Sequence, residues 1–110
     1  MLPETVSQIE ARIKNNPSLT EARRAELLAL LGQLKAEVTS LSKTHAEQAQ
    51  SIAAFADVSA REATRATKNQ ALLDHSVSGL ELSVTEFEDS HPKLVEVVNR
   101  IATALANVGI

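Results

Sequence analysis

The chain has 110 residues, enough for one domain, and a formal net charge of −3. That mild negative charge argues against nucleic-acid binding, which needs a basic face, and the lack of cysteine excludes disulfides and thiolate chemistry. Hydrophobic residues make up 44% of the chain but aromatic residues only 2%, so we expect an aliphatic core.

The N-terminal segment has no basic stretch followed by an apolar run, so we expect no secretory signal. No apolar run approaches the ~20 residues that a helix needs to cross a bilayer. These observations predict a cytoplasmic protein of one domain, residues 1–110, without a membrane as partner.

A short helix is predicted before a turn at Asn15–Pro17. Its Glu10 and Lys14 have the spacing of a favourable i,i+4 pair. We expect the helix to fold back so that its apolar side covers Leu28 and Leu30. That side is made of residues at helical spacing, namely Leu2, Val6, Ile9 and Ile13.

A long amphipathic helix is predicted from Ser18 to about Lys68. Its apolar residues step by four and three positions, the heptad spacing of helices packed side by side at a shallow angle. Its second half is rich in alanine, which favours helix but buries little surface. Unbroken, the helix would be roughly 70 Å long. The heptad positions are Leu27, Leu31, Leu34, Val38, Leu41, His45, Gln48, Ile52 and Phe55.

The start of this helix carries a capping signal. Ser18 and Glu21 have the spacing of a capping box, and Pro17 directly before them disfavours helix in the preceding residue. The same spacing recurs at Thr44 and Glu47, among other places, so this pattern alone does not fix the helix boundaries.

The chain is predicted to reverse at Thr67–Gln70, where Asn69 can cap a second arm. Ser90 or its neighbour Asp89 then caps a last helix with Pro92 in its first turn, or the arm kinks there. The apolar residues of the arm and of the last helix, with a glycine that fits a left-handed C-cap, are Leu73, Val77, Leu80, Val84, Phe87, Leu94, Val98, Ile101, Leu105, Val108 and Gly109.

Together these elements predict an all-α fold. We expect a long antiparallel helical hairpin of coiled-coil type, with the short N-terminal helix packed at one end. A reversal near Lys68 would set Leu41 against Leu94, and His45 opposite His91.

Residues capable of chemistry are few. In this register His45 and His91 could form a two-histidine metal site, and Glu86, Glu88 and Asp89 could suggest acid–base work. The simpler interpretation, a seam histidine, a capping histidine and a solvated acidic face, is favoured because no pocket-forming aromatics accompany them. We therefore expect no catalytic, cofactor-binding or metal residues and no enzymatic activity.

The C-terminal third resembles a known family. The string Phe87–Leu94, followed by Ile101, Leu105 and the final Gly-Ile, is similar to a signature of short helical bacterial proteins, the domain of unknown function 4404 family. The likeness covers about Val84–Ile110, and the middle of the chain looks like a longer version of the family's central helix. The resemblance implies a bacterial, all-helical protein without an established activity. We assign a structural role to Phe87, Ser90, His91 and Pro92.

The leading functional hypothesis is a non-enzymatic interaction or scaffold module that acts as a homo-oligomer, first of all a dimer. Two alanine-rich helices alone would leave several large apolar groups partly uncovered, and a second copy would cover them. The alternative is an adaptor that presents the acidic arm 74–89 to a basic partner protein. The expected interface residues are Ile52, Phe55, Leu72, Leu73 and Leu80.

Overall fold

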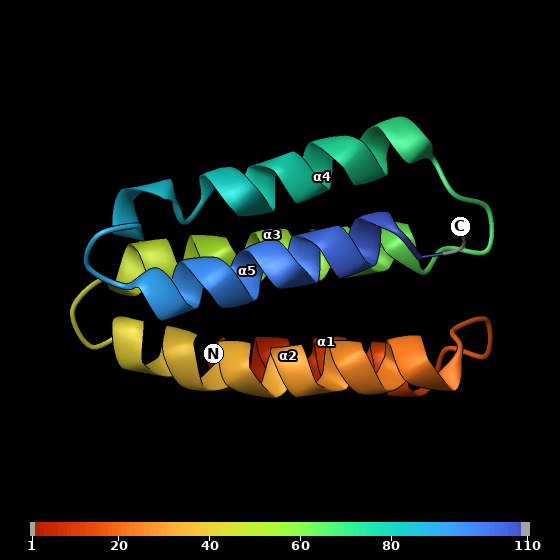
Figure 1. The fold of residues 1–110 in the computed structure, drawn as a ribbon, viewed down its shortest axis with the longest axis horizontal. Helices are drawn as coiled ribbons and strands as arrows, with labels where there is room; N and C mark the ends of the chain where they lie inside the picture. Colours follow the sequence, from red (N-terminus) through yellow and green to blue (C-terminus); the bar gives the residue numbers. More distant parts are fainter. Residues whose placement is uncertain (1, 109–110) are drawn as a thin grey trace.

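A computed structural model describes residues 2–108, and over that range the protein is made of helices without any strand (Figure 1). The all-α prediction is therefore confirmed. The elements are α1 (Leu2–Lys14), α2 (Glu21–Leu41), α3 (Ala46–Ala63), α4 (Gln70–Leu82), the short 3₁₀ helix η1 (Thr85–Phe87) and α5 (Pro92–Ala106).

The helices α2, α3, α4 and α5 form a four-helix bundle, with α1 laid against α2 and α3. In Figure 1 α1 and α2 lie at the bottom, α3 and α5 in the middle and α4 at the top. The molecule measures 37 × 24 × 21 Å, far shorter than the predicted 70 Å helix.

The predicted long helix is wrong, because the chain reverses between Leu41 and Ala46. The His45 N–H donates to the Leu41 carbonyl at 2.8 Å, and the Thr44 hydroxyl donates to the same carbonyl at 3.3 Å. Heptad spacing describes an apolar stripe but not how many helices share it. Folding α3 back gives the leucines of α2 neighbours on α1, α3 and α5, which one extended hairpin would not supply.

The N-terminal helix forms as predicted and buries Val6, Ile9 and Ile13 against its neighbours. Its expected Glu10–Lys14 pair is replaced by a bridge between helices, in which Lys35 Nζ lies 2.7 Å from Glu10 Oε1. Glu10 pairs with a lysine of α2 because α2 packs directly against α1.

Two predicted helix caps are corrected. Thr20, not Ser18, caps α2 and accepts from the Arg23 N–H at 3.1 Å, because Ser18 is held in the preceding turn by Asn16 Oδ1 at 2.6 Å. The N-cap of α5 is His91, whose side chain makes no capping bond. Ser90 instead places its hydroxyl 2.9 Å from His91 Nδ1.

Other predicted boundaries hold. Asn69 caps α4 and accepts from the Leu72 N–H at 3.1 Å, and Pro92 opens α5. Phe87 is buried in η1. The predicted cap at Gly109 lies outside the described residues.

The helical hairpins α2–α3 and α4–α5 have the same local structure, with corresponding residues 46 positions apart in the sequence. His45 corresponds in this way to His91 (91 − 45 = 46). Both histidines are N-caps of nearly the same conformation, with φ −136°, ψ 62° and φ −138°, ψ 63°. Their N–H groups donate to corresponding carbonyls, of Leu41 and Phe87, each at 2.8 Å. The related core positions are buried in both hairpins: Leu27/Leu73, Leu31/Val77, Leu34/Leu80, Val38/Val84, Leu41/Phe87, Ile52/Val98 and Ala56/Ala102.

Candidate functional site

The outer face of α3 and α4 collects the exposed large apolar side chains of residues 2–108. Exposure is 41% for Phe55, 44% for Val58, 49% for Leu72 and 68% for Leu82. Since α3 and α4 pack together, helical spacing puts these side chains along one side of the pair. We call this surface the α3–α4 face and define it by Ser51, Phe55, Val58, Leu72, Gly79 and Leu82.

A close approach between Phe55 and Gly79 shapes the centre of this face. A Cβ built on Gly79 would lie 2.5 Å from Phe55 Cε1 and 2.7 Å from Cδ1, so only glycine leaves room for the ring. A hollow of about 290 Å³ lies beside the ring. It is lined by Gln48, Ser51, Phe55, Gly79, Leu82, Ser83 and Glu86.

The expected interface residues divide into two groups. Phe55 and Leu72 lie on the α3–α4 face, whereas Ile52, Leu73 and Leu80 are each 0% exposed. These three cannot meet a partner at the surface, which corrects the prediction. The reason is that α5 packs against both α3 and α4 and supplies the layer that the hairpin prediction left missing.

Sequence reasoning missed Val58 and Leu82 as exposed apolar residues. Helical spacing could have identified them. Val58 lies three positions after Phe55, and Leu82 lies three positions after Gly79, so each is about one turn along the same side of its helix. Large apolar residues that fall outside the core stripe of a helix identify such a face.

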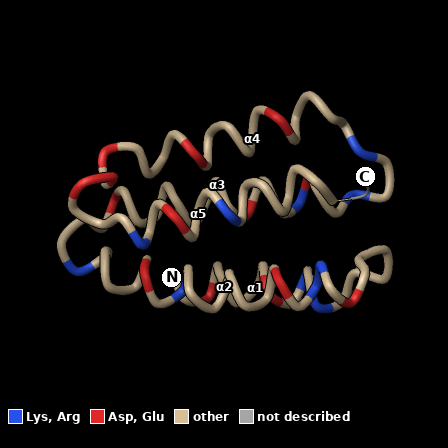
Figure 2. Tube along the Cα trace, viewed as in Figure 1, with Lys and Arg blue, Asp and Glu red and all other residues tan. Residues whose placement is uncertain are grey.

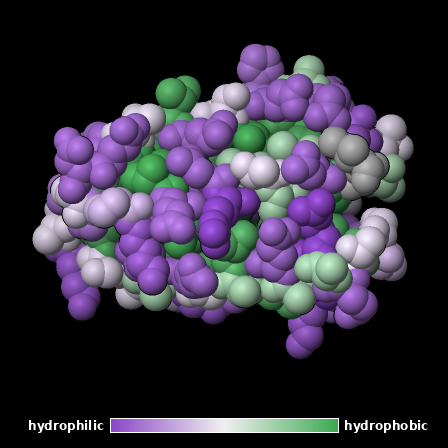
Figure 3. All heavy atoms as spheres, viewed as in Figure 1, coloured by the Kyte–Doolittle hydropathy of each residue, from purple (hydrophilic) through white to green (hydrophobic). Residues whose placement is uncertain are grey.

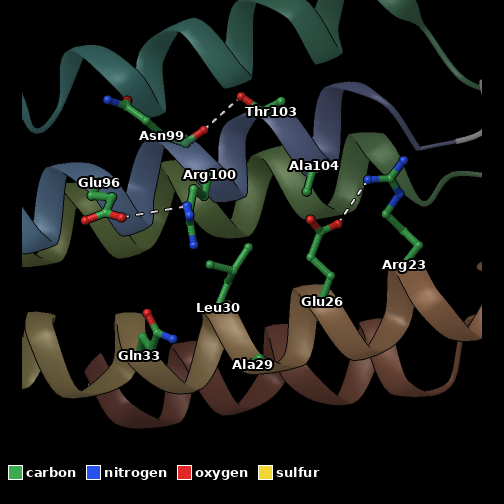
Figure 4. Close-up of a pocket in the computed structure, with 10 residues that line it drawn as sticks. All are labelled: Arg23, Glu26, Ala29, Leu30, Gln33, Glu96, Asn99, Arg100, Thr103 and Ala104. Carbon is green, nitrogen blue, oxygen red and sulfur yellow. Dashed lines mark hydrogen bonds and ion pairs between the residues drawn. The ribbon is translucent and has the colours of Figure 1, made fainter.

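A second groove, of about 730 Å³, runs between α2 and α5 (Figure 4). Leu30, Ala29 and Ala104 give it an apolar floor, and charged side chains stand along its sides. Hydrophilic side chains dominate the surface over α2 and α5 in Figure 3. Its full lining is Arg23, Glu26, Ala29, Leu30, Gln33, Glu96, Asn99, Arg100, Thr103 and Ala104.

The charges of the α2–α5 groove are paired along their own helices. Arg23 Nη1 lies 3.0 Å from Glu26 Oε1, and Arg100 Nε lies 3.8 Å from Glu96 Oε1, four positions earlier on the same helix. Each of these two arginines therefore has a carboxylate partner on its own helix.

An aromatic cluster occupies the end of the bundle where α3 and α5 begin. The ring centroid of Phe87 lies 5.4 Å from that of His45 and 5.5 Å from that of His91. The centroids of the two histidine rings are 6.2 Å apart, and all three pairs are edge to face. The structure thus brings the two histidines together as predicted, but through parallel helices. Thr44 and Ser90 hydroxyls lie 2.8 and 2.9 Å from the respective Nδ1 atoms. Across residues 2–108, no group of three or more His, Asp or Glu side chains is placed to hold a metal ion.

A family comparison covers nearly all of the sequence. The family model described as Domain of unknown function (DUF4404) matches residues 2–110. The chain belongs to this family. No curated protein and no solved structure matches this DUF4404 chain. In its described part, each helix is too short or too polar to traverse a bilayer.

Proposed function

We propose that this protein is a non-enzymatic helical interaction module that associates with itself through the α3–α4 face. The observation that carries the proposal is the collection of Phe55, Val58, Leu72 and Leu82 on one side of a bundle whose core is already closed. Grouped apolar side chains on a surface usually mark an interface. A twofold dimer is the commonest closed assembly. A bacterial origin, from the sequence resemblance, and a cytoplasmic location, from the expected lack of a secretory signal and of a long apolar run, remain part of the proposal.

The internal repeat supplies a comparison within the same molecule. The α2–α5 groove corresponds to the α3–α4 face at the offset of 46 positions. There Glu26 stands where the α3–α4 face has Leu72, and Gln33 where it has Gly79. On the other helix the counterparts of Phe55 and Val58 are Ile101 and Ala104, which are apolar and buried. The repeat therefore shows that the position of Leu72 accepts a charged residue, so packing within one chain does not require an apolar side chain there.

Sedimentation equilibrium over a micromolar range tests the proposal. Wild type should show reversible association, and Phe55→Glu should shift the mass towards one chain because it places a charge at the centre of the contact. The matched control is Gln33→Glu, which adds the same charge in the α2–α5 groove and should leave association unchanged. A wild-type mass of one chain across the whole range would refute self-association.

A second candidate is an adaptor that offers its acidic arm, residues 74–89, to a basic partner protein. The supporting observation is that Glu81, Glu86, Glu88 and Asp89 are exposed and make no ion pair within residues 2–108. Capture of a basic protein that Glu86→Lys/Glu88→Lys abolishes and raised salt weakens would favour this function. Capture insensitive to both would exclude it.

A further inference from the structure

We infer that two copies of the chain meet through their α3–α4 faces in an antiparallel arrangement, with the twofold axis crossing α3 between Phe55 and Val58. This inference rests on the proposed self-association and adds the partner's orientation. It derives from the distribution of charge along the two helices.

The two ends of the α3–α4 face differ in charge: one end is acidic, whereas at the other two arginines are each paired with a carboxylate, Asp57 and Glu62. Glu47 lies in the first turn of α3, and Glu86 follows α4 at the same end, where it lines the hollow beside Phe55. Arg61 and Arg65 lie at the other end, where α3 finishes. In Figure 2 acidic segments follow the end of α4, and a basic segment marks the connection that precedes it.

The two arginines remain accessible to a second carboxylate. Arg61 Nε lies 3.1 Å from Asp57 Oδ2, and the Arg61 side chain is 53% exposed. Arg65 Nε lies 2.8 Å from Glu62 Oε1 without hydrogen-bond alignment, and its side chain is 56% exposed. A guanidinium has five N–H donors, so one intrahelical partner does not exhaust it.

The antiparallel arrangement keeps the two acidic ends apart and sets each of them against the exposed arginines of the other copy. If the twofold axis ran along the helices, each end would face its own copy, and Arg61 would approach another Arg61. With the axis across the helices, Arg61 and Arg65 face the partner's Glu47 and Glu86 at both ends, while the apolar centres coincide. Charge complementarity of this kind fixes the orientation of an interface.

The area of the α3–α4 face indicates how tightly two copies should bind. The 13 residues of α4 span about 20 Å at 1.5 Å per residue, and two packed helices are about 20 Å wide. This footprint is smaller than the roughly 800 Å² per partner of a standard interface. We therefore expect reversible dimerisation in the micromolar range.

Charge reversal distinguishes the two orientations. Glu47→Lys/Glu86→Lys should raise the dimer dissociation constant at least tenfold at low salt, and so should Arg61→Glu/Arg65→Glu. An equimolar mixture of both variants should restore association, because unlike charges again meet at both ends. The matched control, Glu88→Lys/Asp89→Lys, changes the same charge outside the face and should have little effect. Circular dichroism checks that every variant is folded.

Cysteine cross-linking gives an independent readout, since the natural chain has no cysteine. Val58→Cys lies near the axis and should form a disulfide dimer. Ser51→Cys should not, because its copy would lie about ten residues, or roughly 15 Å, along the helix. If the wild-type protein dimerises, but either charge-reversed variant dimerises equally well and Ser51→Cys forms a disulfide dimer, the antiparallel orientation is wrong. The proposed self-association would still stand. A monomeric wild type would instead refute the proposed self-association.

Discussion

The ring of Phe55 lies on the backbone of Gly79, at a distance that leaves no space for a Cβ. Glycine inside a helix costs about 1 kcal/mol relative to alanine. The structure offsets this cost by letting an aromatic ring from α3 pack directly against α4. The pair therefore links the close packing of two helices to the shape of the surface that we propose for self-association.

Gly79→Ala should weaken self-association while leaving the folded monomer nearly as stable. The added methyl group displaces the Phe55 ring, which reshapes the α3–α4 face, and the better helix propensity compensates within about 1 kcal/mol. Sedimentation and urea denaturation measure the two effects separately. A variant with wild-type association would show that the placement of the ring does not matter for the contact.

Leu31→Ala should lower the free energy of unfolding by about 2–5 kcal/mol, as truncation of a buried leucine usually does. Leu31 is 1% exposed in the core of α2. Leu82→Ala is the matched control, because Leu82 is 68% exposed and its truncation should cost within about 0.5 kcal/mol in the monomer. Equal shifts of the urea midpoint for the two variants would contradict the described core.

Arg24→Ala should destabilise the protein by about 1–3 kcal/mol, because it removes the guanidinium that donates hydrogen bonds to the turn before α2. Arg24 Nη2 donates to the carbonyls of Asn16 at 2.6 Å and Leu19 at 3.1 Å. The neighbouring Arg23→Ala, which loses only an exposed pair, should cost at most about 1 kcal/mol. Urea denaturation at one pH compares them, and the reverse order would disprove this role for Arg24.

Asn69→Ala should cost about 0.5–2 kcal/mol, since Asn69 is a true N-cap. Ser90→Ala should cost within about 0.5 kcal/mol, because the exposed Ser90 hydroxyl bonds only the neighbouring histidine ring. Thermal unfolding of both variants under identical conditions provides the comparison. A larger loss for Ser90→Ala would mean that this hydroxyl caps α5 after all.

The candidate site was only partly predictable. Phe55 and Leu72 could be named from the sequence because they are large, apolar and set among small or polar residues. Ile52 and Leu80 have the same local character, yet α5 covers them. Exposure of an apolar side chain depends on which helix lies above it, and that neighbour comes from a distant part of the chain.

By itself the sequence determined the helical class, the aliphatic core and several helix ends. These depend on local chemistry: apolar spacing, the amide of Asn69, and the fixed ring of Pro92. Tertiary structure decided that the chain turns at Ser42–His45, because a continuous heptad pattern serves one long helix and two antiparallel ones equally well. What favours the turn is the core: with α3 folded back, α2, α3, α4 and α5 enclose their aliphatic side chains together, and α1 covers α2 and α3 from the other side.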